Sequence, residues 1–162
     1  MAEINLAVKK LKEKFPASVL EVKTFRDEVS VTLQKKDIFE ICKFLYSESD
    51  LQYQMLIDLC GVDYLPESPR FEVVYFLYSI KNKNRLRLKI KVGEYESVSS
   101  VESIWKAANW LEREVYDLFG IPFDNHPDLR RILLWDGYEG HPLRKDFPVE
   151  GPDFDKPFVP EV

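Results

Sequence analysis

Three carboxylates occupy one short stretch of the sequence, at Glu112, Glu114 and Asp117. Closely spaced carboxylates serve in acid–base catalysis and in binding divalent metals. At these offsets, however, the three side chains cannot all share one face of a helix, and no histidine follows a glutamate by three residues as a di-iron helix requires. Arg113 lies among them, so a structural network of salt bridges is favoured over a catalytic or metal-binding cluster.

The other reactive side chains are two cysteines, Cys42 and Cys60, and two histidines, His126 and His141. Their spacing matches neither a zinc nor an iron–sulfur ligand pattern, and we expect both thiols to be buried and reduced. His126 precedes Pro127, where a capped turn is favoured over a proton-handling role. The glycines form neither a dinucleotide-binding pattern nor a P-loop. We therefore predict no catalytic, cofactor-binding or metal-binding residue in this chain.

A helix is expected to carry the carboxylates. Its apolar positions recur at steps of three and four and form one stripe, made of Ile104, Ala108, Leu111, Val115 and Leu118. Gly120 and Pro122 end the helix. The opposite face places Arg113 one turn before Asp117, so these two side chains are predicted to pair.

The segment that follows is rich in proline, glycine and charge, yet it contains many large apolar residues. They are Phe123, Leu129, Ile132, Leu133, Leu134, Trp135, Leu143, Phe147, Phe154 and Phe158. Such a segment must lie on a surface, either of its own domain or of a partner protein. Its arginines at 130, 131 and 144 are candidates to pair with the helix carboxylates, which would fix how the segment leaves the domain.

The remaining elements follow from periodicity and turn residues. Helices are predicted at 4–15 and from an Asp37 cap to 47, strands at 19–25, 29–33, 55–62, 71–80 and 85–92, and one kinked helix or two over 101–119. The capping pairs Ser99/Glu102 and Asn109/Glu112 would open that last region. The fold class is therefore α+β, with a mostly antiparallel or mixed sheet, helices packed on one side and an extended irregular C-terminal arm.

One predicted strand has a basic face. Lys81, Lys83, Arg85, Arg87, Lys89 and Lys91 fall on odd numbers, while Leu86, Leu88, Ile90 and Val92 fall on even ones. A solvated sheet face is the first interpretation, and a docking surface for an acidic neighbour is the second. Nucleic acid or anionic lipid is weaker, because aromatic residues for base stacking are missing from this face.

The composition is that of an ordinary soluble globular protein, with 162 residues, 45% hydrophobic and 31% charged residues, and a net charge of −5. No apolar run approaches the roughly 20 residues of a membrane span, and the lysine-rich N-terminus is unlike a signal peptide. A cytoplasmic protein is expected. We divide the chain into an α+β domain, 1–121, and an arm, 122–162, that docks on partner subunits.

The helix and the arm together carry a resemblance that covers about forty residues. A first block consists of Glu112, Arg113, Glu114, Asp117, Leu118, Phe119, His126, Arg130, Ile132 and Leu133. A second consists of Gly140, Pro142, Leu143, Arg144, Lys145, Asp146, Phe147, Pro148 and Gly151. These blocks resemble the signature of the C subunit of NADH:quinone oxidoreductase, the 30 kDa subunit family of respiratory complex I.

The resemblance implies a structural subunit of the peripheral arm of a proton-translocating enzyme, without a cofactor of its own. NADH, FMN, iron–sulfur clusters and quinone belong to the complex as a whole. The implied partners are the D subunit, which is like a hydrogenase large subunit, and the B and I subunits, at the cytoplasmic face of the cell membrane. The chain would hold the subunits of the quinone site in place and would reach the membrane only through the complex.

The part of the chain predicted to meet these partners comprises Arg130, Arg131, Leu143, Arg144, Lys145, Asp146 and Phe147. An equivalent subunit of a ferredoxin- or F420-linked complex, or of a membrane-bound hydrogenase, is an open alternative. A free-standing nucleic-acid or regulatory binding module that uses the basic strand is a weaker one.

Overall fold

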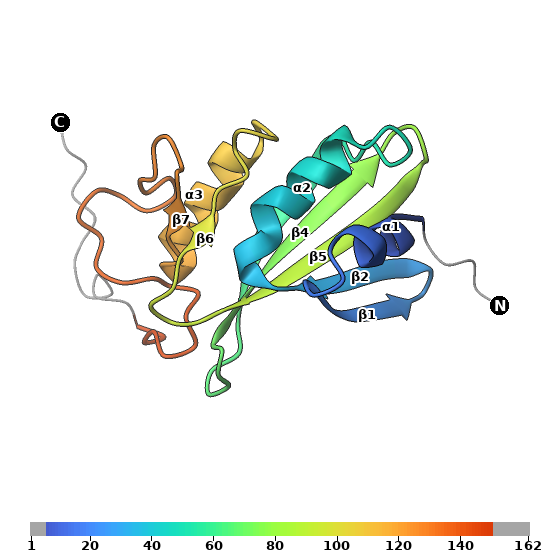
Figure 1. Cartoon of the computed structure of the whole chain (residues 1–162). Helices are drawn as coiled ribbons and strands as arrows, with labels where there is room; N and C mark the ends of the chain where they lie inside the picture. The colour runs from blue at the N-terminus through green and yellow to red at the C-terminus, as the bar shows by residue number, and fades with distance from the viewer. Residues whose placement is uncertain (1–5, 151–162) are drawn as a thin grey trace.

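The computed structural model describes residues 6–150 of the chain (Figure 1). It contains one sheet of five strands with helices on one side, followed by an irregular segment, so the predicted α+β class is confirmed. The predicted anchors Phe154 and Phe158 lie outside the described residues.

The five strands are β1 Val19–Phe25, β2 Glu28–Leu33, β3 Met55–Asp63, β4 Phe71–Ser79 and β5 Asn84–Val92. They lie in the order β1-β2-β5-β4-β3. Neighbouring strands are antiparallel except for β2 and β5, which are parallel, so the sheet is mixed. The hairpin of β1 and β2 and all five predicted strands are present, with ends that differ by at most one residue from the prediction.

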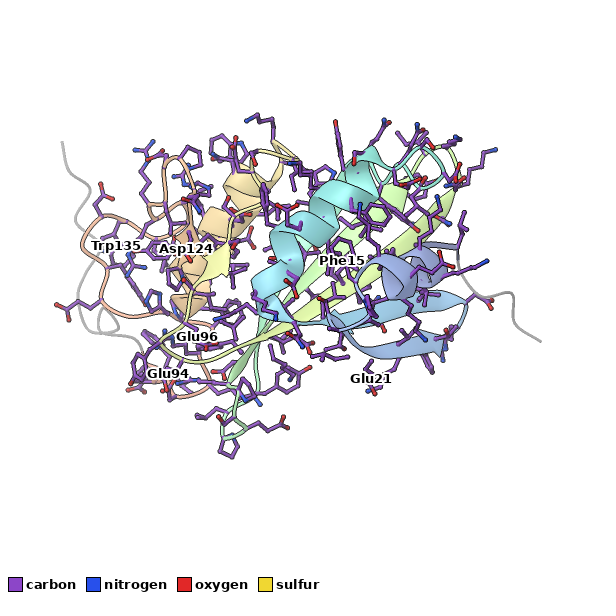
Figure 2. The ribbon with its side chains drawn as sticks, in the orientation of Figure 1. Phe15, Glu21, Glu94, Glu96, Asp124 and Trp135 are labelled. Atoms are coloured by element: carbon purple, nitrogen blue, oxygen red, sulfur yellow. The ribbon has the colours of Figure 1, made fainter. Side chains whose placement is uncertain are left out.

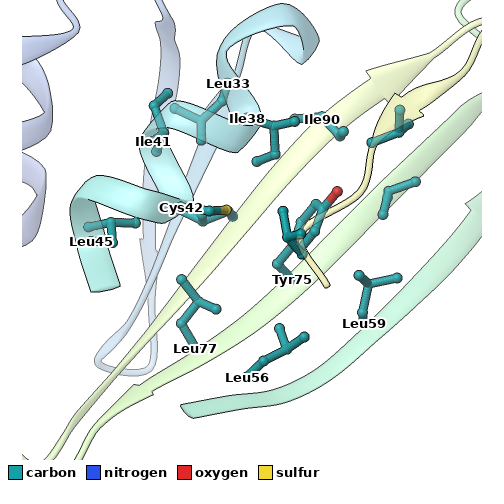
Figure 3. Packing of buried hydrophobic residues seen from close by; sticks show 14 of the residues in the cluster. Leu33, Ile38, Ile41, Cys42, Leu45, Leu56, Leu59, Tyr75, Leu77 and Ile90 are labelled. Carbon is teal, nitrogen blue, oxygen red and sulfur yellow. The ribbon is translucent and has the colours of Figure 1, made fainter. Parts of the chain in front are cut away.

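Three helices cover one face of this sheet: α1 Leu6–Lys14, α2 Ile38–Ser47 and α3 Ala108–Phe119 (Figure 1). A short 3-10 helix, η1 Lys35–Asp37, leads into α2. The core lies between these helices and the sheet, where Cys42 of α2 and Tyr75 of β4 are fully buried among aliphatic side chains (Figure 3). Hydrophobic burial at this interface is the main driving force of the fold.

The alternation predicted for β5 is confirmed. Leu86, Leu88, Ile90 and Val92 are buried against the helices, because successive side chains of a strand point to opposite faces. The prediction that the basic face lacks aromatic rings was wrong. Arg87 lies over the Phe76 ring and Lys91 over the Tyr64 ring, since both rings reach this face from β4 and the loop before it.

Helix starts were predicted less well. Asp37 precedes α2 without making a side-chain cap, because its carboxylate accepts a hydrogen bond from Ser18. Residues 101–107 form turns, so the only α-helix in the predicted region 101–119 is α3, and neither predicted capping box forms. The Glu112 carboxylate instead accepts hydrogen bonds from Ser100 and Val101, so it does not cap the backbone of Asn109.

Two short strands join the body of the protein to the irregular segment. β6 Val98–Ser99 pairs in parallel with β7 Phe123–Asp124, the strand that follows α3. Residues 125–150 contain only turns and bends and lie beside α3, on the side of the molecule away from the β1–β2 hairpin (Figure 1). Residues 122–150 are the described part of the predicted arm, and the arm below means these residues.

Candidate partner-binding surface

Helix α3 positions the arm. The helix lies close to β3, at the edge of the sheet, and Gly61 makes this close approach possible. A Cβ atom built on Gly61 of β3 would lie only 2.8 Å from Cδ2 of Phe119. Glycine therefore permits the close approach of helix and strand. The predicted apolar stripe is confirmed from Ala108 on: Ala108 and Val115 are buried, and Leu111 and Leu118 pack against the same core. Ile104 also packs there, but from a turn that precedes the helix.

The charged residues of α3 are mostly buried. Glu112 and Asp117 have no exposed surface and Arg113 is 7% exposed, whereas Glu114 is exposed. Buried charges require hydrogen bonds or ion pairs, so each of the three must be matched by specific groups. The arm and the segment after β6 supply them.

Glu112 holds the segment after β6. Its carboxylate accepts hydrogen bonds from Ser100 Oγ at 2.6 Å and from the Val101 N–H at 2.7 Å. Burial raises the pKa of Glu112 to about 7, against the effect of these two donors.

Arg113 does not pair with Asp117, and that prediction was wrong. Its Nε and Nη2 atoms donate to the carbonyl oxygens of Arg130 and Arg131 at 3.1 and 2.9 Å. The guanidinium group also lies over the Trp110 ring, 5.3 Å from the centroid. Backbone acceptors of the arm therefore replace the carboxylate one helical turn away.

Asp117 is the main attachment point of the arm. Its Oδ2 atom accepts from three successive backbone N–H groups, those of Ile132, Leu133 and Leu134, at 2.9–3.0 Å. Its Oδ1 atom pairs with Arg131 Nη1 at 2.6 Å. Burial opposes ionisation, but these donors outweigh it and keep the pKa of Asp117 below its usual value. A charge pairing between the helix and the arm, one of the interpretations of the sequence, is thus present here.

The arm also completes the C-terminus of α3. Gly120 ends the helix in the left-handed conformation, with φ of 72°, as the sequence predicted. The carbonyl groups of the last turn then accept hydrogen bonds from the arm. The pairs are His141 Nδ1 to Asp117 O (2.9 Å), Leu143 N–H to Leu118 O (3.1 Å) and Arg144 Nε to Phe119 O (2.6 Å). Cationic groups at this end also match the helix dipole.

A second attachment joins the arm to the ends of β3 and β4. Arg70, which is 5% exposed, pairs with Asp63 at 2.8 Å and with Glu94 at 2.8 Å, and it also binds Asp146 of the arm. The Lys145 N–H donates to Asp63 Oδ2 at 2.9 Å. The Arg70 guanidinium keeps the pKa of Asp63 well below its usual range. The far part of the arm is therefore held by a buried ion pair.

His126 stabilises a turn. Its Nδ1 atom accepts from the Asp128 N–H at 3.0 Å, so its Nε2 atom carries the proton and donates to Asn109 O at 3.1 Å. Both ring nitrogens are thereby occupied by backbone groups.

The residues predicted to meet a partner divide into two groups. Arg131, Arg144 and Asp146 make the internal contacts described above, and Phe147 stacks on Tyr138 beside Gly140. Arg130, Leu143 and Lys145 are exposed. Among the described residues, the ion-pair partner of Arg130 is Asp128, whose side chain is also exposed.

Large apolar side chains remain exposed on the arm even though its backbone is held. Leu133, Trp135 and Leu143 are 61%, 57% and 52% exposed. Figure 2 shows Trp135 at the left of the molecule, on the arm, and Glu21 at the lower right, on the β1–β2 hairpin. The sequence indicated such residues only as a class, because their exposure depends on which neighbours the arm uses to bury the others. Exposed apolar side chains on a fixed backbone are typical of a protein-binding surface.

Within the described residues, no group of three histidine, cysteine or acidic side chains is arranged to hold a metal ion. Both cysteines are free thiols; Cys42 is buried as predicted, whereas Cys60 is only partly buried. The described helices include none that is long and apolar enough to span a membrane.

Residues 31–153 match the family model described as "Respiratory-chain NADH dehydrogenase, 30 Kd subunit". The C subunit of NADH-quinone oxidoreductase from Geobacter metallireducens is 60% identical over 154 residues, which cover 94% of each chain. The same subunit from Geotalea uraniireducens is 58% identical over 94% of this chain and 93% of its own. Among solved structures, a trypsin-resistant fragment of Nqo5 is similar with a TM-score of 0.65 and 31% identity, covering 76% of this chain and all of the fragment.

Proposed function

Because this chain belongs to the family of the 30 kDa subunit of respiratory-chain NADH dehydrogenase, we propose that it is a structural subunit without a cofactor of its own. In this role it supports electron transfer from NADH through iron–sulfur clusters to quinone. It does so by holding the subunits of the quinone site in place, at the cytoplasmic face of the cell membrane.

The observation that supports this role is that the backbone of the arm is held in place while the side chains of Leu133, Trp135 and Leu143 are exposed. Asp117 fixes residues 132–134, and Leu133 and Trp135 project from that same stretch. A surface that is already ordered loses little conformational entropy when it binds, so such side chains contribute efficiently to affinity. The partners proposed for it are the D subunit, which is like a hydrogenase large subunit, and the B and I subunits.

The residues proposed for the interface act in two ways. Leu143, Arg130 and Lys145 are accessible and would contact a partner directly, together with Leu133 and Trp135. Arg131, Arg144, Asp146 and Phe147 would shape the surface from within, because their side chains bind α3, Arg70 or Tyr138. Replacing a member of the first group should affect assembly alone, whereas replacing Arg131, Arg144 or Phe147 should affect the fold as well. Replacing Asp146, whose side chain is half exposed, should affect the fold least within the second group.

The test uses the tagged full chain expressed in a strain that lacks its own copy. Leu133→Ser, Trp135→Ser and Leu143→Ser are compared with Leu20→Ser and Phe25→Ser, which change similarly exposed apolar residues of the β1–β2 hairpin. We expect the combined arm variant to lose at least about tenfold of the co-purifying B, D and I subunits, since anchor residues contribute ~2 kcal/mol each. The hairpin variants should retain them.

Thermal unfolding of each purified chain serves as the control for folding, and the melting temperature should be nearly unchanged in the five single variants and in the combined arm variant. Normal recovery of the B, D and I subunits with the combined arm variant would contradict the proposed interface. A loss of NADH:quinone activity should accompany the loss of assembly.

A further inference from the structure

Glu112 combines complete burial with purely neutral hydrogen-bond donors. Its carboxylate is bound by the Ser100 hydroxyl and the Val101 N–H, and among the contacts of residues 6–150 no lysine or arginine reaches it. The other buried carboxylates behave differently, since Asp117 is paired with Arg131 and Asp63 with Arg70. A buried carboxylate without a cation is the one that most readily takes up a proton.

Ser100 links this carboxylate to solvent. The residue is 6% exposed and lies at the wall of an open polar pocket of about 480 Å³ between α2 and the segment after β6. The pocket is lined by Lys36, Phe39, Glu40, Ser99, Ser100, Ser103 and Asn125. The pocket gives solvent a path to Ser100, whose hydroxyl donates to Glu112 at 2.6 Å and accepts from the Glu102 N–H at 3.2 Å.

We propose that Glu112 is a proton-binding site, and that proton uptake reverses the Ser100–Glu112 hydrogen bond that ties the segment after β6 to helix α3. In the ionised state Ser100 Oγ donates to Glu112 Oε2, as observed. A hydronium ion that reaches the pocket from solvent gives its proton to the carboxylate and leaves a water molecule. The resulting carboxylic acid O–H donates to Ser100 Oγ, which also keeps its hydrogen bond from the Glu102 N–H. The serine hydroxyl then turns its own proton towards the pocket, and the Val101 N–H keeps its acceptor at Oε1.

The groups around Glu112 favour the neutral acid. Burial is the largest effect on its pKa, and the negative charge of Glu102 adds to it. Cys42 of α2 and Tyr75 of β4 lie near enough for Glu112 to raise the pKa of each, in addition to burial, so both remain neutral. The Tyr75 hydroxyl is buried without a hydrogen-bond partner among the described residues. Burial, with a smaller contribution from the charge of Glu102, raises the pKa of Glu112 to about 7 against the effect of the Ser100 and Val101 donors.

This site acts on the helix that holds the arm. Glu112 and Asp117 lie on the same helix, which joins the segment after β6 on one side and the arm on the other. The inference concerns the chain itself and does not require a partner protein. It can therefore hold or fail independently of the proposed function.

Carbon NMR of the glutamate carboxyl groups in the full chain tests the site directly. We expect one resonance to titrate with a midpoint about two pH units above the surface glutamates, and to vanish in Glu112→Gln. Glu114→Gln, an exposed neighbour on the same helix, should leave that resonance unchanged. The Val101 amide should shift with the same midpoint.

Ser100→Ala tests the role of the serine. Loss of a donor to the ionised form should raise the midpoint by about 0.5–1 pH unit. A Glu112 resonance that titrates together with the surface glutamates would overturn the proposal, as would a Val101 amide that ignores the titration. If Glu112→Gln fails to fold, through-bond assignment of Glu112 in the unaltered chain gives the same answer.

Discussion

The Nη1 atom of Arg131 lies 2.6 Å from Oδ1 of Asp117, and this pair joins the arm to helix α3. The two residues are 14 positions apart in the sequence, and the same aspartate also accepts the next three backbone N–H groups of the arm. One buried carboxylate thus binds both the Arg131 guanidinium and the backbone of the segment proposed to meet a partner.

Asp117→Asn should release this part of the arm. The substitution removes the negative charge opposite Arg131 and leaves one oxygen in place of two, so we expect the free energy of unfolding to fall by about 2–4 kcal/mol. Hydrogen exchange of the Ile132, Leu133 and Leu134 amides should become at least about tenfold faster. Asp128→Asn, which removes an exposed partner of Arg130, is the matched control and should change neither quantity noticeably. Equal exchange rates in the two variants would contradict the assigned role.

Glu112 should make the fold less stable as pH rises through neutrality. The pKa of Glu112 is about 7 in the folded chain and near its ordinary value of 4.5 when unfolded, so the folded state binds more protons between these limits. The contribution of Glu112 to the free energy of unfolding is therefore fully present below pH 4.5 and is lost as pH rises through 7. The loss amounts to about 3 kcal/mol, because each pKa unit corresponds to about 1.4 kcal/mol.

Urea denaturation at pH 5 and pH 8 measures this effect by comparing the unaltered chain with Glu112→Gln. From pH 5 to pH 8, the free energy of unfolding of the glutamine variant should rise by about 2–3 kcal/mol relative to that of the unaltered chain. His141 contributes in the opposite direction, because burial lowers its pKa and stability then rises with pH up to about 6.5. Both chains carry His141, so the difference between them isolates Glu112. A difference that does not vary with pH would exclude the effect.

Gly61→Ala should push α3 away from β3. Its new Cβ atom would lie 2.8 Å from the Phe119 ring, and relief of such overpacking costs about 1–3 kcal/mol. Phe119→Leu shortens the opposing side chain, so the double variant should be more stable than the sum of the two single losses predicts. Denaturation of all four chains in urea completes the cycle. Strictly additive losses would show that the two side chains do not compete for the same space.

Two of the three acidic partners of Arg70, Asp63 and Asp146, should differ in how much they stabilise the fold. Asp63 has a side chain that is 2% exposed, and Asp63→Asn leaves a buried guanidinium with fewer counter-charges, so we expect a loss of about 3 kcal/mol. Asp146 is 52% exposed at its side chain, and Asp146→Asn should cost less than about 1 kcal/mol. The free energies of unfolding from urea denaturation provide the comparison, and similar losses in both variants would refute this ranking.

The stability of the fold at low pH depends on two buried carboxylates, Asp63 and Asp117. Arg70 keeps the pKa of Asp63 low, and backbone donors with Arg131 do the same for Asp117, so both groups contribute stability above their ordinary pKa of 3.8. That contribution disappears as pH falls through their lowered values. The chain in which Asp63 is replaced by asparagine should therefore lose less stability between pH 4 and pH 2 than the unaltered chain, as measured by urea denaturation at each pH.

Sequence reasoning recovered the parts of the fold that depend on neighbouring residues. The alternation of Leu86, Leu88 and Ile90 identified a core-facing strand, and Gly120 identified the end of α3. Strand pleat, helical repeat and turn chemistry act over a few residues, so the chain itself contains the information. It also contains the family signature, whose residue types and offsets are visible without a structure.

The order of the strands and the partners of the charged residues were decided by the tertiary structure. The parallel pairing of β2 with β5 and the pairing of Asp117 with Arg131 join segments that local periodicity treats separately. Helical spacing favoured Arg113 as the partner of Asp117, but the arm placed a guanidinium and three N–H groups on the same carboxylate. Buried charges select the partners that best replace water, and those partners exist only after distant segments have packed together.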